Sequence, residues 1–78
     1  MNSLWSLKAG DTAKIVNFSD ELPASYQSRL TELGFHPGNE VNCHHSPGMG
    51  APKVYRVSNT FYSLDDKIAG QIAIERSE

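Results

Sequence analysis

The chain has 78 residues, of which 38% are hydrophobic and 21% are charged, and this composition is ordinary for a soluble globular protein. A chain of this length has no room for a catalytic core with a second substrate domain, so we expect one domain over residues 1–78. Seven basic and nine acidic residues give a net charge of −2 without any basic run, which argues against a general binder of the nucleic-acid backbone.

Cys43 is the only cysteine, so no disulfide can form within the chain, and this fits a reducing compartment. Residues 1–8 lack the basic segment followed by a long apolar segment that a secretory signal needs. No stretch approaches the roughly 20 apolar residues of a membrane span. We therefore expect a cytoplasmic protein that meets a membrane only through a partner.

Short apolar runs separated by turn residues predict a mainly β chain. The first strand is expected at residues 12–18, directly after the turn signal Gly10-Asp11. Within it Ala13 and Ile15 alternate, and then Val16 and Phe18 do. This change of phase predicts a bulge or the end of the strand.

One helix interrupts the strands. Its signature is a stripe at spacings i, i+4, i+8 and i+11, formed by Leu22, Tyr26, Leu30 and Leu33. Pro23 is tolerated in the first turn, and Asp20 and Glu21 favour the positive end of the helix dipole. Gly34 is expected to end the helix in a left-handed conformation. Phe35 then falls where it can pack against Leu30 and attach the helix end to the core.

Four further strands are expected after the helix. The first covers Glu40 to His45, with Val41, Cys43 and His45 on its inner face. The glycines and prolines of residues 46–52 predict a loop. Two strands, at residues 53–57 and 60–64, are joined by a hairpin at Ser58-Asn59, and a helical turn capped by Asp65 leads to a last strand with Ile72 and Ile74 inward. The order predicts a small β-barrel of about five strands with the helix between the first and second.

Cys43, His44 and His45, with His36 upstream, are potential ligands for a transition metal. Strand alternation places Cys43 and His45 on one face and turns His44 away, which leaves two ligands where a stable or open zinc site needs three or four. We therefore expect a buried thiol and neither a metal site nor a cofactor. The same alternation separates Cys43 from His44 as a nucleophile and its base, so no catalytic residue and no enzyme activity are predicted.

The order of signals resembles the FeoA family of bacterial ferrous-iron uptake, over nearly the whole chain. The carrying residues are Leu4-x-x-Leu7-x-x-Gly10, then Arg29-Leu30-x-x-Leu33-Gly34-Phe35-x-Pro37-Gly38, the Pro47–Pro52 loop, and Leu64 to Ile74 with Ala69 and Ile72. The leucine-glycine-x-x-proline-glycine portion is the most specific, because a helix cap and a tight turn back to back reverse the chain in few residues. Ala51 in a longer loop, and Asp65 where relatives often carry arginine, depart from the family pattern.

The resemblance implies an SH3-like barrel and a cytosolic accessory protein of ferrous iron uptake. Its implied partner is the Feo membrane transporter, whose cytosolic part contains a GTPase domain, and the implied role is that of a protein-interaction module without catalysis. The same barrel occurs as a metal-responsive module in iron- and manganese-dependent repressors. Those proteins place a helix-turn-helix domain ahead of it, for which the residues before the first strand are too few.

A nucleic-acid-binding barrel is the other class of function that the sequence leaves open. Tyr55, Phe61 and Tyr62 lie on neighbouring predicted strands, with Lys53 and Arg56 nearby. The positive charges are nevertheless scattered along the chain, and the alternation of Tyr55 and Tyr62 with apolar residues favours inward positions. We therefore expect no nucleic-acid partner.

A partner surface is predicted on the helix, opposite the apolar stripe. That face carries the uncharged residues Ala24, Gln27, Ser28 and Thr31, which another protein can cover without desolvating an ion. Arg29 lies at its flank as part of a polar rim. Met49, in the Pro47–Pro52 loop, is the next position expected to contact a partner.

Overall fold

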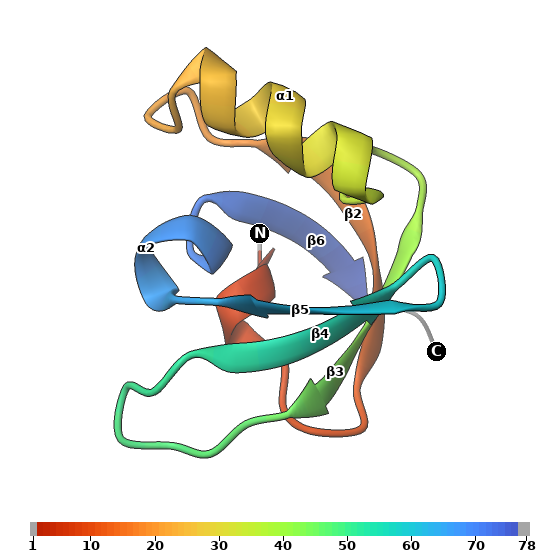
Figure 1. Ribbon diagram of the computed structural model, residues 1–78, viewed down its shortest axis with the longest axis vertical. Helices are drawn as coiled ribbons and strands as arrows, with labels where there is room; N and C mark the ends of the chain where they lie inside the picture. The colour runs from red at the N-terminus through yellow and green to blue at the C-terminus, as the bar shows by residue number, and fades with distance from the viewer. Residues whose placement is uncertain (1, 77–78) are drawn as a thin grey trace.

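The computed structural model describes residues 2–76. Its elements are β1 (Asn2–Ser3), the 3-10 helix η1 (Leu4–Ser6), β2 (Thr12–Phe18), α1 (Ala24–Leu33), β3 (Glu40–His45), β4 (Lys53–Val57), β5 (Thr60–Leu64), α2 (Asp66–Ala69) and β6 (Ile72–Arg76). All strands belong to one antiparallel sheet with the order β1-β6-β2-β3-β4-β5. Figure 1 shows this sheet curled into a small barrel with α1 lying across one end.

The five predicted strands are confirmed, and β1 is an addition to them. Its two residues pair with Ala73 and Ile74 of β6. Because of β1, the helix α1 lies between the second and third strands and not between the first and second. Two residues are too few to show the alternation by which a strand is recognised in a sequence.

Two register shifts bend the strands. The shift between Ile15 and Asn17 of β2 confirms the bulge that the change of phase predicts. The second shift lies between Cys43 and His45 of β3, so that Cys43 pairs with Tyr55 and His45 with Val54. The prediction that His45 shares the inner face with Cys43 is therefore wrong: Cys43 is fully buried, whereas His45 is exposed. The extra residue of a bulge reverses the alternation beyond it.

The beginning of α1 differs from the prediction. Leu22 is buried but precedes the helix, and Pro23 occupies the position before the first helical residue, so neither Asp20 nor Glu21 lies in the first turn. Tyr26, expected to face the core, has 51% of its surface exposed. Only Leu30 of the helical residues is buried, because α1 lies at the end of the barrel and not against the middle of its sheet. No helix among residues 2–76 combines the length and the apolar run needed to cross a membrane.

The end of α1 is confirmed in detail. Gly34 has a φ of +116°, and its N–H donates to the carbonyls of Leu30 and Thr31. The N–H of Phe35 donates to Leu30 at 2.9 Å, and Phe35 is fully buried in the same core cluster as Leu30. These are the two hydrogen bonds of a Schellman motif, so the helix end is attached to the core.

The core fills the barrel with residues from nearly every element. Its buried members include Leu4, Leu7, Ala13, Ile15, Val41, Cys43, Tyr55, Val57, Ala69, Ile72 and Ile74. Tyr62 and Leu64, on the inner face of β5, are half-buried and pack against this cluster. The predicted inward positions of β4, β5 and β6 are thus confirmed.

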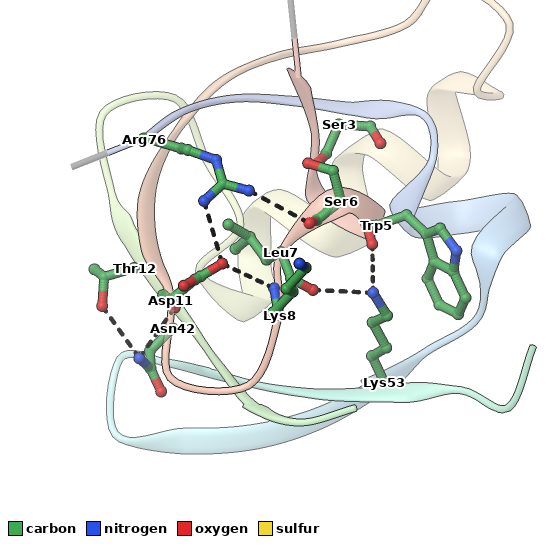
Figure 2. A network of polar contacts seen from close by, with 10 residues as sticks. All are labelled: Ser3, Trp5, Ser6, Leu7, Lys8, Asp11, Thr12, Asn42, Lys53 and Arg76. Atoms are coloured by element: carbon green, nitrogen blue, oxygen red, sulfur yellow. Dashed lines mark hydrogen bonds and ion pairs between the residues drawn. The ribbon is translucent and has the colours of Figure 1, made fainter. Parts of the chain in front are cut away.

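Polar side chains attach the N-terminal segment to the barrel (Figure 2). The ammonium group of Lys53 donates to the carbonyls of Trp5 and Leu7 and lies 4.7 Å from the centre of the Trp5 ring. The buried Tyr55 hydroxyl donates to the carbonyl of Leu4 at 3.1 Å. Because carbonyls that are shielded from water need donors, these contacts hold η1 against the core.

Candidate functional site

A groove opens between α1 on one side and the end of β5 with α2 on the other. It encloses about 370 Å³ and is lined by Tyr26, Arg29, Leu30, Leu33, Leu64, Asp65 and Ile68. In Figure 1 α1 lies above β5, and α2 continues from the end of β5. We call this feature the α1–β5 groove.

Local sequence signals build both walls of the groove. The Schellman motif at Gly34 brings Phe35 under the helix, where its ring meets that of Tyr62 edge-on at a centroid distance of 5.7 Å. On the other wall, the Asp65 side chain accepts a hydrogen bond from the N–H of Ile68 and begins α2 as predicted. Ile68 is half-buried there and packs against the core cluster.

The groove combines an apolar floor with charged groups at its rim. Leu33, Leu64 and Ile68 are only half-buried, so each keeps apolar surface that water still contacts. Asp65 is engaged by the cap of α2. The guanidinium group of Arg29, by contrast, makes no hydrogen bond or ion pair with any other residue in the range 2–76. An apolar floor beside an unpaired cation is typical of a surface that another protein covers.

The structure brings five of the predicted partner-binding residues together on α1. Ala24, Ser28, Arg29 and Thr31 are exposed, and Arg29 also lines the groove. Gln27 is half-buried because its side-chain amide donates to the carbonyl of Leu22 at 2.7 Å. These residues form a continuous face and rim of one helix.

Met49 does not join them. It is fully exposed in the loop between β3 and β4, which lies at the opposite end of the molecule from α1 in Figure 1. One partner segment in the groove therefore cannot also contact Met49. The groove residues Tyr26, Leu33, Leu64 and Ile68 cannot be recognised as surface from the sequence, since their spacing indicates only that they are apolar.

The potential metal ligands are dispersed. The Cys43 thiol is buried in the core as predicted, and desolvation raises its pKa. His44 lies on the outside, where its ring meets that of Phe61 at 4.8 Å. Within residues 2–76 no three His, Cys, Asp or Glu side chains are grouped closely enough to hold a metal ion.

A second hollow, of about 460 Å³, lies on the outer face of the sheet beside the hairpin of β4 and β5. Three of its polar side chains have partners within the chain: Asn39 donates to Gly34, Asn42 to Asp11, and Arg56 to Asn59. Its lining is polar apart from the buried Val41, so it lacks the apolar floor of the α1–β5 groove.

The residues considered for nucleic-acid binding do not form a stacking surface. Tyr55 is fully buried, Tyr62 is half-buried with its ring edge-on to Phe35, and the ammonium group of Lys53 is bound to backbone carbonyls. Of these aromatic residues, Phe61 alone is exposed. A single-strand binder needs several exposed rings along a basic groove.

Comparisons with known proteins place this geometry in a family. Residues 2–76 match the model of the FeoA domain. Curated protein sequences include no match to the chain. Among solved structures, zinc-complexed FeoA from Stenotrophomonas maltophilia is 26% identical over 96% of this chain and 91% of its own, with a TM-score of 0.84. That protein is described as a prokaryotic SH3 domain protein and a candidate activating factor of ferrous iron transport.

Two further structures share the fold. The FeoA protein of Chlorobium tepidum is 21% identical, covers 99% of this chain and 71% of its own, and superposes with a TM-score of 0.88. An iron uptake regulatory protein, also FeoA, is 18% identical over 97% of both chains with a TM-score of 0.85. The fold is accordingly SH3-like. With a family match over residues 2–76 and the same barrel in these relatives, the chain belongs to the FeoA domain family.

Proposed function

We propose that this protein is a cytoplasmic accessory protein of ferrous iron uptake, which docks on the cytosolic part of the Feo membrane transporter through the α1–β5 groove and the adjoining face of α1. The observation that carries the proposal is the groove itself, with half-buried Leu33, Leu64 and Ile68 beside the unpaired Arg29. Membership of a family linked to ferrous iron transport supports the identity of the partner.

Docking at the groove is favourable for a simple physical reason. Covering the exposed parts of Tyr26, Leu33 and Ile68 removes apolar surface from water, at about 25 cal/mol per Å². Ala24, Ser28 and Thr31 extend this contact without an ion to desolvate. Tyr26 and Arg29, both exposed in this structure, are of the residue types that are enriched at the centre of a protein interface.

In this proposal the protein affects transport by binding to the transporter and not by catalysing a reaction. The cytosolic part of the transporter includes a GTPase domain, which exchanges between nucleotide states. A module that binds one of these states more tightly shifts the transporter toward it by the ratio of the two affinities. No catalytic residue of this protein is required for such an effect.

Charge reversal at the groove tests the proposal. Arg29→Glu should weaken binding to the detergent-solubilised transporter about tenfold, because it places an anion at the rim where a cation was unpaired. Lys8→Glu is the matched control, since Lys8 is also an exposed cation but lies in the turn before β2. Its affinity should stay within about twofold of the parent.

The outer face of α1 needs its own variant. Ser28→Glu combined with Thr31→Lys leaves the net charge unchanged and should lower the affinity while leaving the melting temperature nearly unchanged. If Arg29→Glu binds with full affinity, the groove is not part of the interface. If the Ser28→Glu and Thr31→Lys variant binds with full affinity, the outer face of α1 is not part of the interface. A parent protein that fails to bind the transporter at all would refute the proposed function.

A further inference from the structure

The strand β5 is a long open edge of the sheet. Within residues 2–76 it pairs with β4 on one side and with no strand on the other. The opposite edge of the sheet is β1, which has two residues and offers little to pair with. Edge strands are usually protected by shortness, proline or charge. The β5 residues, Thr60–Leu64, contain neither a proline nor a charged side chain.

The hairpin geometry identifies which backbone groups are open. Ser58 and Asn59 both have positive φ, as in a two-residue type I′ turn, so the closing pair Val57 and Thr60 is hydrogen-bonded. Hydrogen bonding alternates along an antiparallel pair. Phe61 and Ser63 therefore direct their N–H and C=O groups away from β4.

These outward groups have no partner within the described chain. Among the hydrogen bonds of residues 2–76, none outside the sheet ladder involves the backbone of Phe61 or Ser63. Both residues are exposed, and the Phe61 side chain has 53% of its surface in contact with solvent. A strand placed beside β5 would thus find two residues ready to exchange hydrogen bonds with it.

The open edge and the α1–β5 groove are adjacent. Leu64 belongs to β5 and also lines the groove, and α1 forms the opposite wall. A residue opposite Tyr62 or Leu64 on an added strand would direct its side chain toward the inner face, where Leu30, Leu33 and Ile68 lie. Its neighbours along the strand would point outward, over Phe61.

We propose that the transporter docks by adding an extended segment of its cytosolic part to β5 as a further strand, with alternate apolar side chains in the groove and an acidic side chain opposite Arg29. This mode rests on the proposed function and specifies its chemistry. Backbone hydrogen bonds to Phe61 and Ser63 would supply affinity, and the groove would select the alternate side chains, as in other cases of strand addition.

The size of the groove favours such a segment over a second copy of this chain. In a symmetric pairing of two β5 strands, each copy would bring its own α1 and barrel wall to the same edge. A volume of about 370 Å³ between α1 and the end of β5 has room for a few apolar side chains of an extended peptide. The Arg29 guanidinium, which has no partner among residues 2–76, attracts an acidic side chain, and Asp65 on the same rim is already bound to the N–H of Ile68.

Hydrogen exchange of the intact protein, with and without the solubilised transporter, tests the alternation. The amides of Phe61 and Ser63 should slow at least about tenfold on binding, whereas those of Tyr62 and Leu64, already bonded to β4, should change little. Ser63→Pro removes one outward N–H that β4 does not use, and should lower the affinity about tenfold. Ser63→Thr keeps that N–H and should bind like the parent.

Each result separates the hypotheses. If the parent binds but the Phe61 and Ser63 amides exchange as before, or if Ser63→Pro binds like Ser63→Thr, strand addition is refuted and the proposed function stands. If these amides are protected without the transporter, in a protein that sediments as a dimer, the occupant is a second copy and the proposal is wrong. If the parent does not bind the transporter, the proposed function fails and strand addition with it.

Discussion

Replacing Gly34 tests the junction that holds α1 over the barrel. Gly34 has a φ of +116°, which an L-residue adopts only with strain. A Cβ added there would lie 2.9 Å from the Ser58 hydroxyl oxygen and 3.4 Å from a methyl carbon of Val57. Gly38 provides a matched control, because its φ is +90° but a Cβ would meet nothing within 4 Å. The two glycines therefore separate backbone strain from steric contact.

The magnitudes follow from these two contributions. Strain of a left-handed residue costs about 1–2 kcal/mol. Gly38→Ala should lower the free energy of unfolding by this amount only, because its Cβ meets no other atom. Gly34→Ala adds a crowded contact worth about 1 kcal/mol, at the low end for overpacking because exposed Ser58 can shift. The sum of about 2–3 kcal/mol lowers the melting temperature of a domain this size by about 10–20 °C. Gly34→Val should exceed it, since a branched side chain adds atoms to the same contact.

Thermal unfolding followed by circular dichroism measures these differences. Combining Gly34→Ala with Ser58→Ala removes the oxygen that the new Cβ meets. The melting temperature of this double variant should therefore rise from that of Gly34→Ala toward that of Gly38→Ala. Equal losses for Gly34→Ala and Gly38→Ala would show that the contact with Ser58 is absent. An unchanged melting temperature for both would refute the left-handed conformation at the end of α1.

Two further substitutions test the attachment of the N-terminal segment. Tyr55→Phe removes one of the two donors to the carbonyl of Leu4, which also accepts from the N–H of Leu7 at 3.2 Å. It should lower the free energy of unfolding by about 0.5–1.5 kcal/mol in urea titrations, and an unchanged free energy would contradict the hydrogen bond. The N–H of Lys8, and then Arg76 at 3.2 Å, lower the pKa of Asp11 below its ordinary value of 3.8. A lowered carboxyl pKa stabilises the fold above that ordinary value and loses this contribution as the pH falls below it. The parent should thus lose more stability than Asp11→Asn between about pH 4 and pH 2, and parallel acid profiles would exclude the contribution of Asp11.

Much of the barrel was predictable because its signals are local. Gly34 and Phe35 end α1 through hydrogen bonds to residues within five positions, and Asp65 begins α2 through a bond to Ile68. The hairpin at Ser58-Asn59 likewise depends on two adjacent residues. Both partners of each of these interactions lie within a few residues of one another in the sequence, so the sequence alone predicts them.

The candidate site was decided by contacts between distant segments. His45 is exposed because the pairing of β3 with β4 introduces a bulge, and its place in an alternating sequence cannot show that. Tyr26 shares the spacing of buried Leu30, yet its exposure depends on where α1 crosses the barrel. The groove and the open edge of β5 exist only because the sheet order places that strand last and α1 beside it. Periodicity tells which side of an element is apolar, but only tertiary packing determines how much of that side is covered.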